Sequence, residues 1–325
     1  MSPSSETVDH IVEKVAGGDR RAIARAISLV ENEGEASSDL LKKIYTRTGK
    51  GYRIGVTGPP GAGKSTLTNK LAKYYRADGL RVGIIAVDPT SPFTGGALLG
   101  DRVRMSEVEL DEGVFIRSMA SRGSLGGLSK KAKEAADILD AAGHDVVMME
   151  TVGVGQSELD VAGAADTTIV VLVPESGDGI QAMKAGLMEI ADFFVLNKAD
   201  RSGADQAVMS LKMILGFHPH QEKSWMPDVV KTQASEGKGV EEVAVLIKRH
   251  QEFLRATGGL EQKRKARLER RIRDIIDDQL HLDFWNSERS VELRKKIELI
   301  LQRQSNPYDA AAALIQDFKS ERAPQ

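Results

Sequence analysis

The fold of this chain is decided by residues 58–65, which read Gly-Pro-Pro-Gly-Ala-Gly-Lys-Ser. This stretch matches the phosphate-loop pattern G-x-x-x-x-G-K-[ST]. The apolar run at 53–57 before it predicts a strand, and residues 66–72 after it predict a helix with Leu67 and Leu71 one turn apart. A chance glycine-rich turn is a poor alternative because strand and helix are both in place. The stretch therefore predicts a strand–loop–helix unit that holds nucleotide phosphates.

Each part of this loop has a chemical task. Its glycines allow a tight turn in which successive backbone N–H groups point at phosphate oxygens, and the helix N-terminus adds partial positive charge. Lys64 is expected to reach the β- and γ-phosphates, and Ser65 to offer its hydroxyl to Mg²⁺. The expected phosphate-binding set is Gly58, Gly61, Ala62, Gly63, Lys64, Ser65 and Thr66.

Residues 50–257 alternate strand and helix signals. The apolar runs at 81–88, 145–151, 167–174 and 192–198 predict buried strands. Such strands, separated by helical stretches, indicate a parallel sheet covered on both faces. The predicted fold class is α/β: a P-loop NTPase domain with a mostly parallel sheet flanked by helices. In such sheets ligands bind at the carboxyl ends of the strands.

Both ends of the chain read as helical. Residues 1–49 carry three apolar stripes and predict an N-terminal extension that packs on the main domain, with a docking surface for a partner as the alternative. Residues 258–325 predict a C-terminal helical arm. Its basic cluster is interleaved with acids, which favours a solvated helix face over nucleic-acid binding. Because its apolar stripes must be buried somewhere, we expect self-association or partner docking there.

Composition narrows the class of protein. The chain has 325 residues, of which 41% are hydrophobic and 28% charged, and its net charge of -2 gives no global attraction to nucleic acid or to an anionic membrane. No apolar run approaches the about 20 residues of a membrane span, and a secretory signal is not apparent. Cysteine is absent, which excludes disulfides and thiolate zinc sites. We expect a cytoplasmic enzyme with neither nucleic acid nor membrane as a partner.

Residues 197–200 read Asn-Lys-Ala-Asp, an N-K-x-D sequence at the end of a predicted strand. The Asp200 carboxylate can accept from N1–H and the exocyclic amino group of guanine, a donor pair that adenine lacks. The Lys198 stem can cover the face of the base. The alternative is that Asn197 and Asp200 only cap the next helix. The place of the motif in the chain favours GTP over ATP.

The strand at 145–150 ends in Glu150, whose carboxylate is expected to hold Mg²⁺, directly or through water, opposite Ser65. Gly153 follows, placed to approach a γ-phosphate through its backbone N–H. Gln156 is a candidate for orienting the attacking water, with a solvent-facing loop glutamine as an equal alternative.

Two glycine-containing loops at strand ends are candidates for nucleotide-dependent switches. The loop after the second strand holds Asp88 and Asp101, which can reach Mg²⁺ and become ordered when the γ-phosphate is present. An N-cap on the following helix is a competing interpretation of Asp101. In the loop at 174–184, Asp178 and Lys184 form either a switchable ion pair or ordinary exposed charges.

Together these motifs resemble those of a known group. They are the phosphate loop at 58–65, Asp-Pro-Thr-Ser-Pro at 88–92, Leu-Gly-Asp-Arg-Val-Arg-Met at 99–105, Glu-Thr-Val-Gly-Val-Gly-Gln-Ser-Glu at 150–158 and Asn-Lys-Ala-Asp at 197–200. The set resembles the P-loop GTPases that assist metalloenzyme maturation, and most of all the methylmalonyl-CoA mutase-associated GTPases, the MeaB-like or ArgK group. The likeness covers most of the chain, including both helical ends.

The resemblance implies hydrolysis of GTP to GDP and phosphate with Mg²⁺. It implies a homodimer with much of its contact through the C-terminal helices. It also implies a partner, adenosylcobalamin-dependent methylmalonyl-CoA mutase, whose cofactor loading and protection the GTPase gates. The implied catalytic residues are Lys64, Asp101, Glu150 and Gly153, and the implied Mg²⁺ residues are Ser65, Asp88, Asp101 and Glu150. The implied guanine residues are Asn197, Asp200 and Ala234, to which the motif itself adds Lys198. The implied switch residues are Asp178 and Lys184, and the candidate for orienting water, Gln156, is counted with them.

The second base-contact loop departs from the family pattern. The family usually has Ser before Ala, whereas this loop reads Thr-Gln-Ala-Ser at 232–235. A contact to guanine O6 would come from the Ala234 backbone N–H, so recognition of the base can survive without side-chain support from a serine at position 233.

Three other functions stay open from the sequence. A metal-insertion GTPase for a nickel enzyme is disfavoured because cysteine and a histidine cluster are both absent. A small-molecule or protein kinase would use ATP, which Asn-Lys-Ala-Asp at 197–200 argues against. A non-catalytic scaffold, in which the nucleotide is only structural, would release negligible phosphate even with the mutase bound.

Overall fold

The computed structural model describes residues 5–32, 34–88, 108, 110–120, 130–151, 157–176, 186–216 and 224–321. The chain divides into two compact units, Met1–Glu261 and Gln262–Gln325, and each is described by itself.

The first unit is built on a parallel sheet, which confirms the predicted α/β fold class. Among the described residues the sheet has seven strands in the order β3-β2-β4-β1-β5-β6-β7, and each neighbouring pair is parallel. The strands are β1 (Tyr52–Thr57), β2 (Val82–Asp88), β3 (Val114–Ala120), β4 (Val146–Thr151), β5 (Thr167–Leu172), β6 (Phe193–Leu196) and β7 (Val229–Lys231). Every residue of β1, β4, β5 and β6 is buried, as expected for strands covered on both faces.

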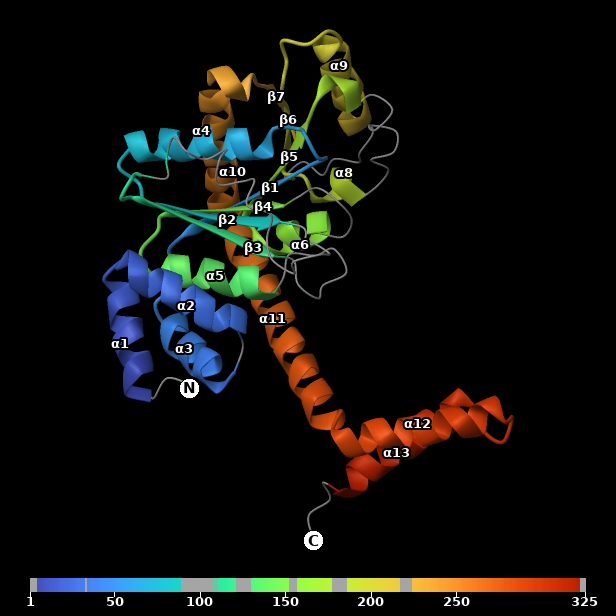
Figure 1. Cartoon of the computed structure of the whole chain (residues 1–325). Coiled ribbons are helices and arrows are strands. Elements are labelled where there is room, and N and C mark those ends of the chain that lie inside the picture. Colours follow the sequence, from blue (N-terminus) through green and yellow to red (C-terminus); the bar gives the residue numbers. More distant parts are fainter. Residues whose placement is uncertain are drawn as a thin grey trace. The chain divides into compact units, whose positions relative to one another are not determined.

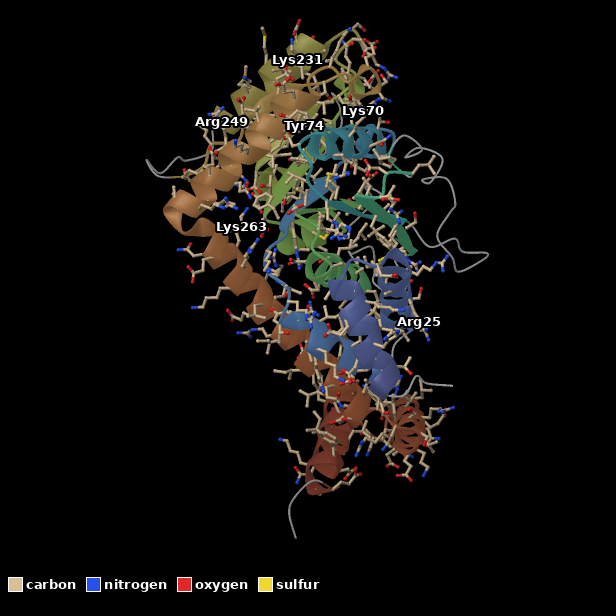
Figure 2. All side chains as sticks on the ribbon, turned by 90° about the vertical axis from the view of Figure 1, so that its left-hand side faces the viewer. Arg25, Lys70, Tyr74, Lys231, Arg249 and Lys263 are labelled. Atoms are coloured by element: carbon tan, nitrogen blue, oxygen red, sulfur yellow. The ribbon has the colours of Figure 1, made fainter. Side chains whose placement is uncertain are left out.

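Helices cover both faces of the sheet (Figure 1). On one face α4 (Lys64–Ala77) and α10 (Val240–Thr257) share a core with alternate residues of the central strands. Figure 2 shows Lys70 and Tyr74 of α4 beside α10, which carries Arg249. The opposite face is covered by α5 (Lys130–Ala141) and α6 (Ser157–Ala164), and towards the β6–β7 edge by α8 (Gly186–Ile190) and α9 (Ala204–Gly216). This layering places the loop between β1 and α4 at the carboxyl edge of the sheet.

The predicted N-terminal helices are present as α1 (Ser5–Ala16), α2 (Arg20–Asn32) and α3 (Glu35–Tyr45). Their apolar stripes are buried and share one core with α5, so this extension packs on the main domain as predicted (Figure 1). The Asp140 carboxylate accepts hydrogen bonds from the backbone N–H groups of Gly49, Lys50 and Gly51 at 2.7, 3.1 and 2.8 Å. It thereby fixes the segment that joins α3 to β1.

The buried Arg53 side chain lies beside the same carboxylate. Its guanidinium donates to Asp137 at 2.6 Å, and Asp140 lies 3.8 Å away. These acids raise the pKa of Arg53, against the lowering effect of its burial, so the three charges are held as one cluster.

The second unit is helical, as the charge-rich pattern predicted. It comprises most of α11 (Gly259–Phe284), with α12 (Ser287–Leu301) and α13 (Pro307–Glu321). Arg289 fastens this unit internally, because its guanidinium lies over the rings of Phe284 and Phe318 and pairs with Glu321. By contrast, α11 has no buried residue, and its apolar stripe is exposed.

Within the described part of the chain, no helix has the length and apolar character needed to cross a membrane.

Candidate functional site

The loop at 58–63 is shaped by glycines in left-handed or extended positive-φ conformations. Gly58 has φ 134°, and a Cβ atom there would lie 2.0 Å from the carbonyl oxygen of Val171. Gly63 caps α4 with φ 90°, and a Cβ atom there would lie 2.3 Å from Nδ2 of Asn197. A side chain at either position would therefore displace a neighbouring strand or loop. The turn leads into the N-terminus of α4, where an anion is favoured.

Lys64 and Ser65 open α4, and both are buried. The Lys64 ammonium donates to the carbonyl oxygens of Gly58 and Pro59 at 2.8 and 3.0 Å, so it lies across the mouth of the loop. The Ser65 hydroxyl donates to Oε1 of Glu150 at 2.5 Å. The structure thus brings together a phosphate-type loop, an ammonium group and a hydroxyl–carboxylate pair.

Asn197 directly follows β6, and its side chain connects the end of this strand to the phosphate loop. Its Nδ2 donates to the carbonyl oxygen of Ala62 at 2.8 Å. Its Oδ1 accepts from the Thr232 hydroxyl and from the Ala234 N–H, both at 3.0 Å. Four segments of the chain therefore meet at one buried amide: the phosphate loop, the end of β6, the end of β7 and the turn after β7.

The other N-K-x-D residues border the same corner. Lys198 has φ 56°, and its ammonium donates to the carbonyl oxygen of Gly61 at 2.8 Å. Asp200 is exposed to solvent. Arg201, next to it, donates to Glu175 at 2.5 Å, and this hydrogen bond is the main cause that lowers the pKa of Glu175. Thr66 lies half-buried on the first turn of α4. Lys198 and Asp200 belong to one turn, in which the Arg201 N–H donates to the carbonyl oxygen of Lys198 at 3.0 Å.

Several predicted site residues cannot be placed in this geometry. The backbone of Asp88 ends β2, but its side chain lies outside the described residues. The remaining predicted residues that lie outside the described part of the chain are Asp101, Gly153, Gln156, Asp178 and Lys184. The described site therefore consists of the phosphate loop, Glu150 and a group that we call the Asn197 corner. This corner is formed by Ala62, Asn197, Lys198, Thr232 and Ala234.

The oxygen atoms at Ser65 and Glu150 fit a magnesium ion. Mg²⁺ is commonly held by one or two protein oxygens together with water and nucleotide phosphate. A buried hydroxyl and carboxylate converge here directly beside the phosphate loop. No cluster of three or more His, Cys, Asp or Glu that could hold a metal occurs among the described residues.

Sequence reasoning missed two sets of residues at this site. The sequence places Thr232 at the end of the last strand and in the second base-contact loop but assigns it no role, whereas its hydroxyl donates to Oδ1 of Asn197 at 3.0 Å. Thr57 and Thr151 also form a buried hydroxyl pair at the ends of β1 and β4. Their sequence signal is that Thr57 directly precedes the phosphate loop and that Thr151 follows Glu150 within the motif at 150–158.

The fold and the site together define a P-loop GTPase. A family model described as "Methylmalonyl Co-A mutase-associated GTPase MeaB" matches residues 23–289. The chain belongs to this family, which confirms the resemblance to the MeaB-like or ArgK group.

Two relatives and one solved structure are each similar to at least 80% of this chain. A relative from Pyrococcus abyssi is 49% identical over 313 residues, covering 96% of this chain and 97% of the relative. The GTPase ArgK of Escherichia coli is 40% identical over 266 residues, 80% of each chain. A crystal structure of a LAO/AO transport system kinase aligns with a TM-score of 0.74 and 29% identity, covering 98% of this chain and 100% of that one. The chain is accordingly a guanine-nucleotide-binding hydrolase.

Proposed function

We propose that this GTPase acts with Mg²⁺ as a chaperone that gates adenosylcobalamin loading and protection of methylmalonyl-CoA mutase. The observation that carries the nucleotide part is the Asn197 corner, where one buried amide joins the phosphate loop to both base-contact loops. The mutase part is supported by the description of the family, which names that enzyme.

The described residues divide the work of binding and hydrolysis. Lys64 and the loop N–H groups bind the β- and γ-phosphates, and Asp200 reads the guanine. The Ala234 N–H, which donates to Oδ1 of Asn197 in this structure, would share its hydrogen with guanine O6. Ser65 and Glu150 would hold Mg²⁺, with Asp88 and Asp101 as further candidates. Bound there, the ion would neutralise charge that develops on the phosphate oxygens. Gly153 would approach the γ-phosphate through its backbone N–H, and Gln156, Asp178 and Lys184 are the proposed switch residues.

We further propose three domains: a helical extension at 1–49, a G domain at 50–257 and a C-terminal helical arm at 258–325. The protein is proposed to be a homodimer whose contact lies largely in that arm. The support is the exposed apolar stripe of α11, which five large side chains form. They are Leu268, Ile272, Ile275, Ile276 and Leu280, which are 41–50% exposed. A stripe of this kind is a typical association surface, and a second copy of the same helix would bury it.

The identity of the base is tested by turnover of GTP and of ATP. The wild-type protein should prefer GTP by orders of magnitude. Asp200→Ala should lose most of this preference, because the guanine donors N1–H and N2–H₂ are left unpaired. Asp205→Ala is the matched control, since Asp205 is also an exposed acid beyond β6 and pairs with Lys231 instead. A variant that keeps the full GTP preference would refute the role of Asp200. Preferred ATP turnover with phosphate transfer to an acceptor would support the kinase alternative.

The partner is tested by capture from cell extract on immobilised protein loaded with a non-hydrolysable GTP analogue or with GDP. Recovery of the mutase in a nucleotide-dependent amount is expected. Recovery of no mutase in either state would refute the proposed client. Stoichiometric nickel in the purified protein would favour the metal-insertion alternative.

A further inference from the structure

Two buried threonines join the ends of the two central strands. The Oγ1 atoms of Thr57 and Thr151 lie 2.9 Å apart, and the two residues are 0% and 1% exposed. Thr57 is the last residue of β1, and Thr151 is the last residue of β4. Because β1 and β4 are neighbours in the sheet, this hydrogen bond closes the carboxyl end of their pairing.

Both threonines adjoin the nucleotide site in the chain. Thr57 directly precedes Gly58 of the phosphate loop, and Thr151 directly follows Glu150. The register of the parallel pair sets Val56 opposite Glu150, so the threonines are the next residues on each strand. Any change in the distance between these two strand ends must therefore move Glu150 relative to the phosphate loop.

The hydroxyl pair and the Glu150 side chain lie on opposite faces of the sheet. Side chains alternate along a strand, and Val56 belongs to the core that α4 covers. Glu150 points to the same side, where its carboxylate meets Ser65 at 2.5 Å. Gly55, two residues before Thr57, faces Val161 of α6 on the other side. The end of β4 therefore forms a hydrogen bond on each face of the sheet: Glu150 accepts from Ser65 on one face, and Thr151 bonds to Thr57 on the other.

We propose that Thr57 and Thr151 are a positioning pair that holds Glu150 at the distance from Ser65 that magnesium binding requires. The proposal rests on the magnesium role given to Glu150 above. Neither threonine touches the ion or the nucleotide. Their hydrogen bond opposes the separation of β1 from β4 at the point where β4 leaves the sheet, and so it reduces the number of orientations open to Glu150 when Ser65 turns to the ion.

If the pair only stabilised the sheet, the loss of any buried hydrogen bond of β1 would weaken the Mg²⁺ response equally. A second buried hydrogen bond of β1 allows this comparison. At the opposite end of the same strand, the Tyr52 hydroxyl bonds to Oγ1 of Thr167 at 2.6 Å, also in a buried setting. Tyr52→Phe therefore removes one buried hydrogen bond from β1 without touching the nucleotide end. A general loosening of the sheet would affect both ends alike.

The test measures the Mg²⁺ concentration that half-saturates the tightening of a fluorescent GDP analogue, together with the affinity for that analogue in EDTA. Thr57→Val and Thr151→Val keep the shape of the side chain and lose its hydroxyl. Each should raise the half-saturating Mg²⁺ concentration about three- to tenfold, the effect of one hydrogen bond, and leave the affinity in EDTA unchanged. The double variant should match the single ones, because only one hydrogen bond is lost. Thr57→Ser and Thr151→Ser keep the hydroxyl and should resemble the wild type, as should Tyr52→Phe.

Three outcomes would overturn the proposal. If the valine variants keep the wild-type Mg²⁺ response, the pair does not position Glu150. If Tyr52→Phe shifts the response equally, the effect belongs to the stability of the sheet. If the wild type itself shows no Mg²⁺ response, the magnesium role of Glu150 fails, and the positioning role fails with it. Thermal melting verifies folding, and an alanine variant replaces any valine variant that does not fold.

Discussion

Asn197 holds the base corner and the phosphate loop together through one side chain. Asn197→Ala removes the donor to Ala62 and the acceptor of Thr232 and Ala234, leaving buried backbone groups without partners. We expect the affinity for GDP to fall at least about tenfold, since each lost buried hydrogen bond costs about 1 kcal/mol or more. Calorimetric titration with GDP measures this. Thr232→Val removes only one of the three bonds and should give a smaller loss. Equal losses in the two variants would contradict a shared role for the three bonds.

His144 makes stability depend on pH at the other end of the sheet. The residue is 3% exposed, and its Nδ1–H donates to the carbonyl oxygen of Leu139 at 2.8 Å. Burial lowers its pKa from 6.5 to about 4. The unfolded chain therefore binds a proton between pH 6.5 and 4 that the folded chain does not, and stability contributed by the neutral ring is lost as the pH falls through this window.

Urea denaturation at several pH values checks this prediction. The wild type should lose up to about 3 kcal/mol between pH 6.5 and 4 through this residue. His144→Gln should be less stable at neutral pH but show a flatter dependence on pH. His10→Gln, at an exposed position on α1, should follow the wild-type curve. If the unfolding free energies of His144→Gln and the wild type fall in parallel with pH, His144 is not the source of the pH dependence.

At the scale of elements, Asp140 on α5 sets where β1 begins. Its carboxylate receives three consecutive backbone N–H groups from the segment between α3 and β1, and it adjoins the buried Arg53. Asp140→Asn removes the negative charge and replaces one carboxylate oxygen with an amide NH₂ group, which cannot accept a hydrogen bond from those N–H groups. We expect about 1–3 kcal/mol of lost stability in urea denaturation, with activity per folded molecule unchanged. Asp39→Asn is the matched control, because Asp39 is 41% exposed and its ion pair with Lys43 contributes little. A loss as large in the control would show that α5 does not anchor this segment.

At the scale of the whole molecule, the proposed homodimer places the exposed stripe of α11 in the contact between two copies of the chain. Ile272→Glu combined with Ile276→Glu places two charges in the centre of the stripe. We expect sedimentation velocity to give the mass of a dimer for the wild type and of a monomer for this variant, because a buried unpaired carboxylate strongly opposes association. Arg270→Glu, on the opposite face of the helix by its spacing, should remain dimeric. A wild-type monomer at all concentrations would refute the proposed homodimer.

Much of the fold followed from local pattern. The glycine-rich loop, the near-continuous apolar strands and the 3.6-residue stripes depend only on neighbours in the chain, so the order of elements around the phosphate loop was predictable. The apolar run at 114–116 predicts only a short strand, because Arg117 and Ser118 interrupt it, whereas the observed strand spans Val114–Ala120. In the sheet it is held by complete pairing with β2, which a single-strand pattern does not reveal.

The candidate site also has one part that local patterns predict and one part that depends on contacts between distant segments. The motifs predicted a shared site for Lys64, Ser65, Glu150 and Asn197, because each residue lies in a short pattern at the end of a predicted parallel strand, and such ends meet at one edge of the sheet. Only the tertiary structure decided that Thr232 supports Asn197 and that Thr57 bonds to Thr151. These contacts join residues 35 and 94 positions apart, and their partners are set by strand order and register, which no local pattern contains.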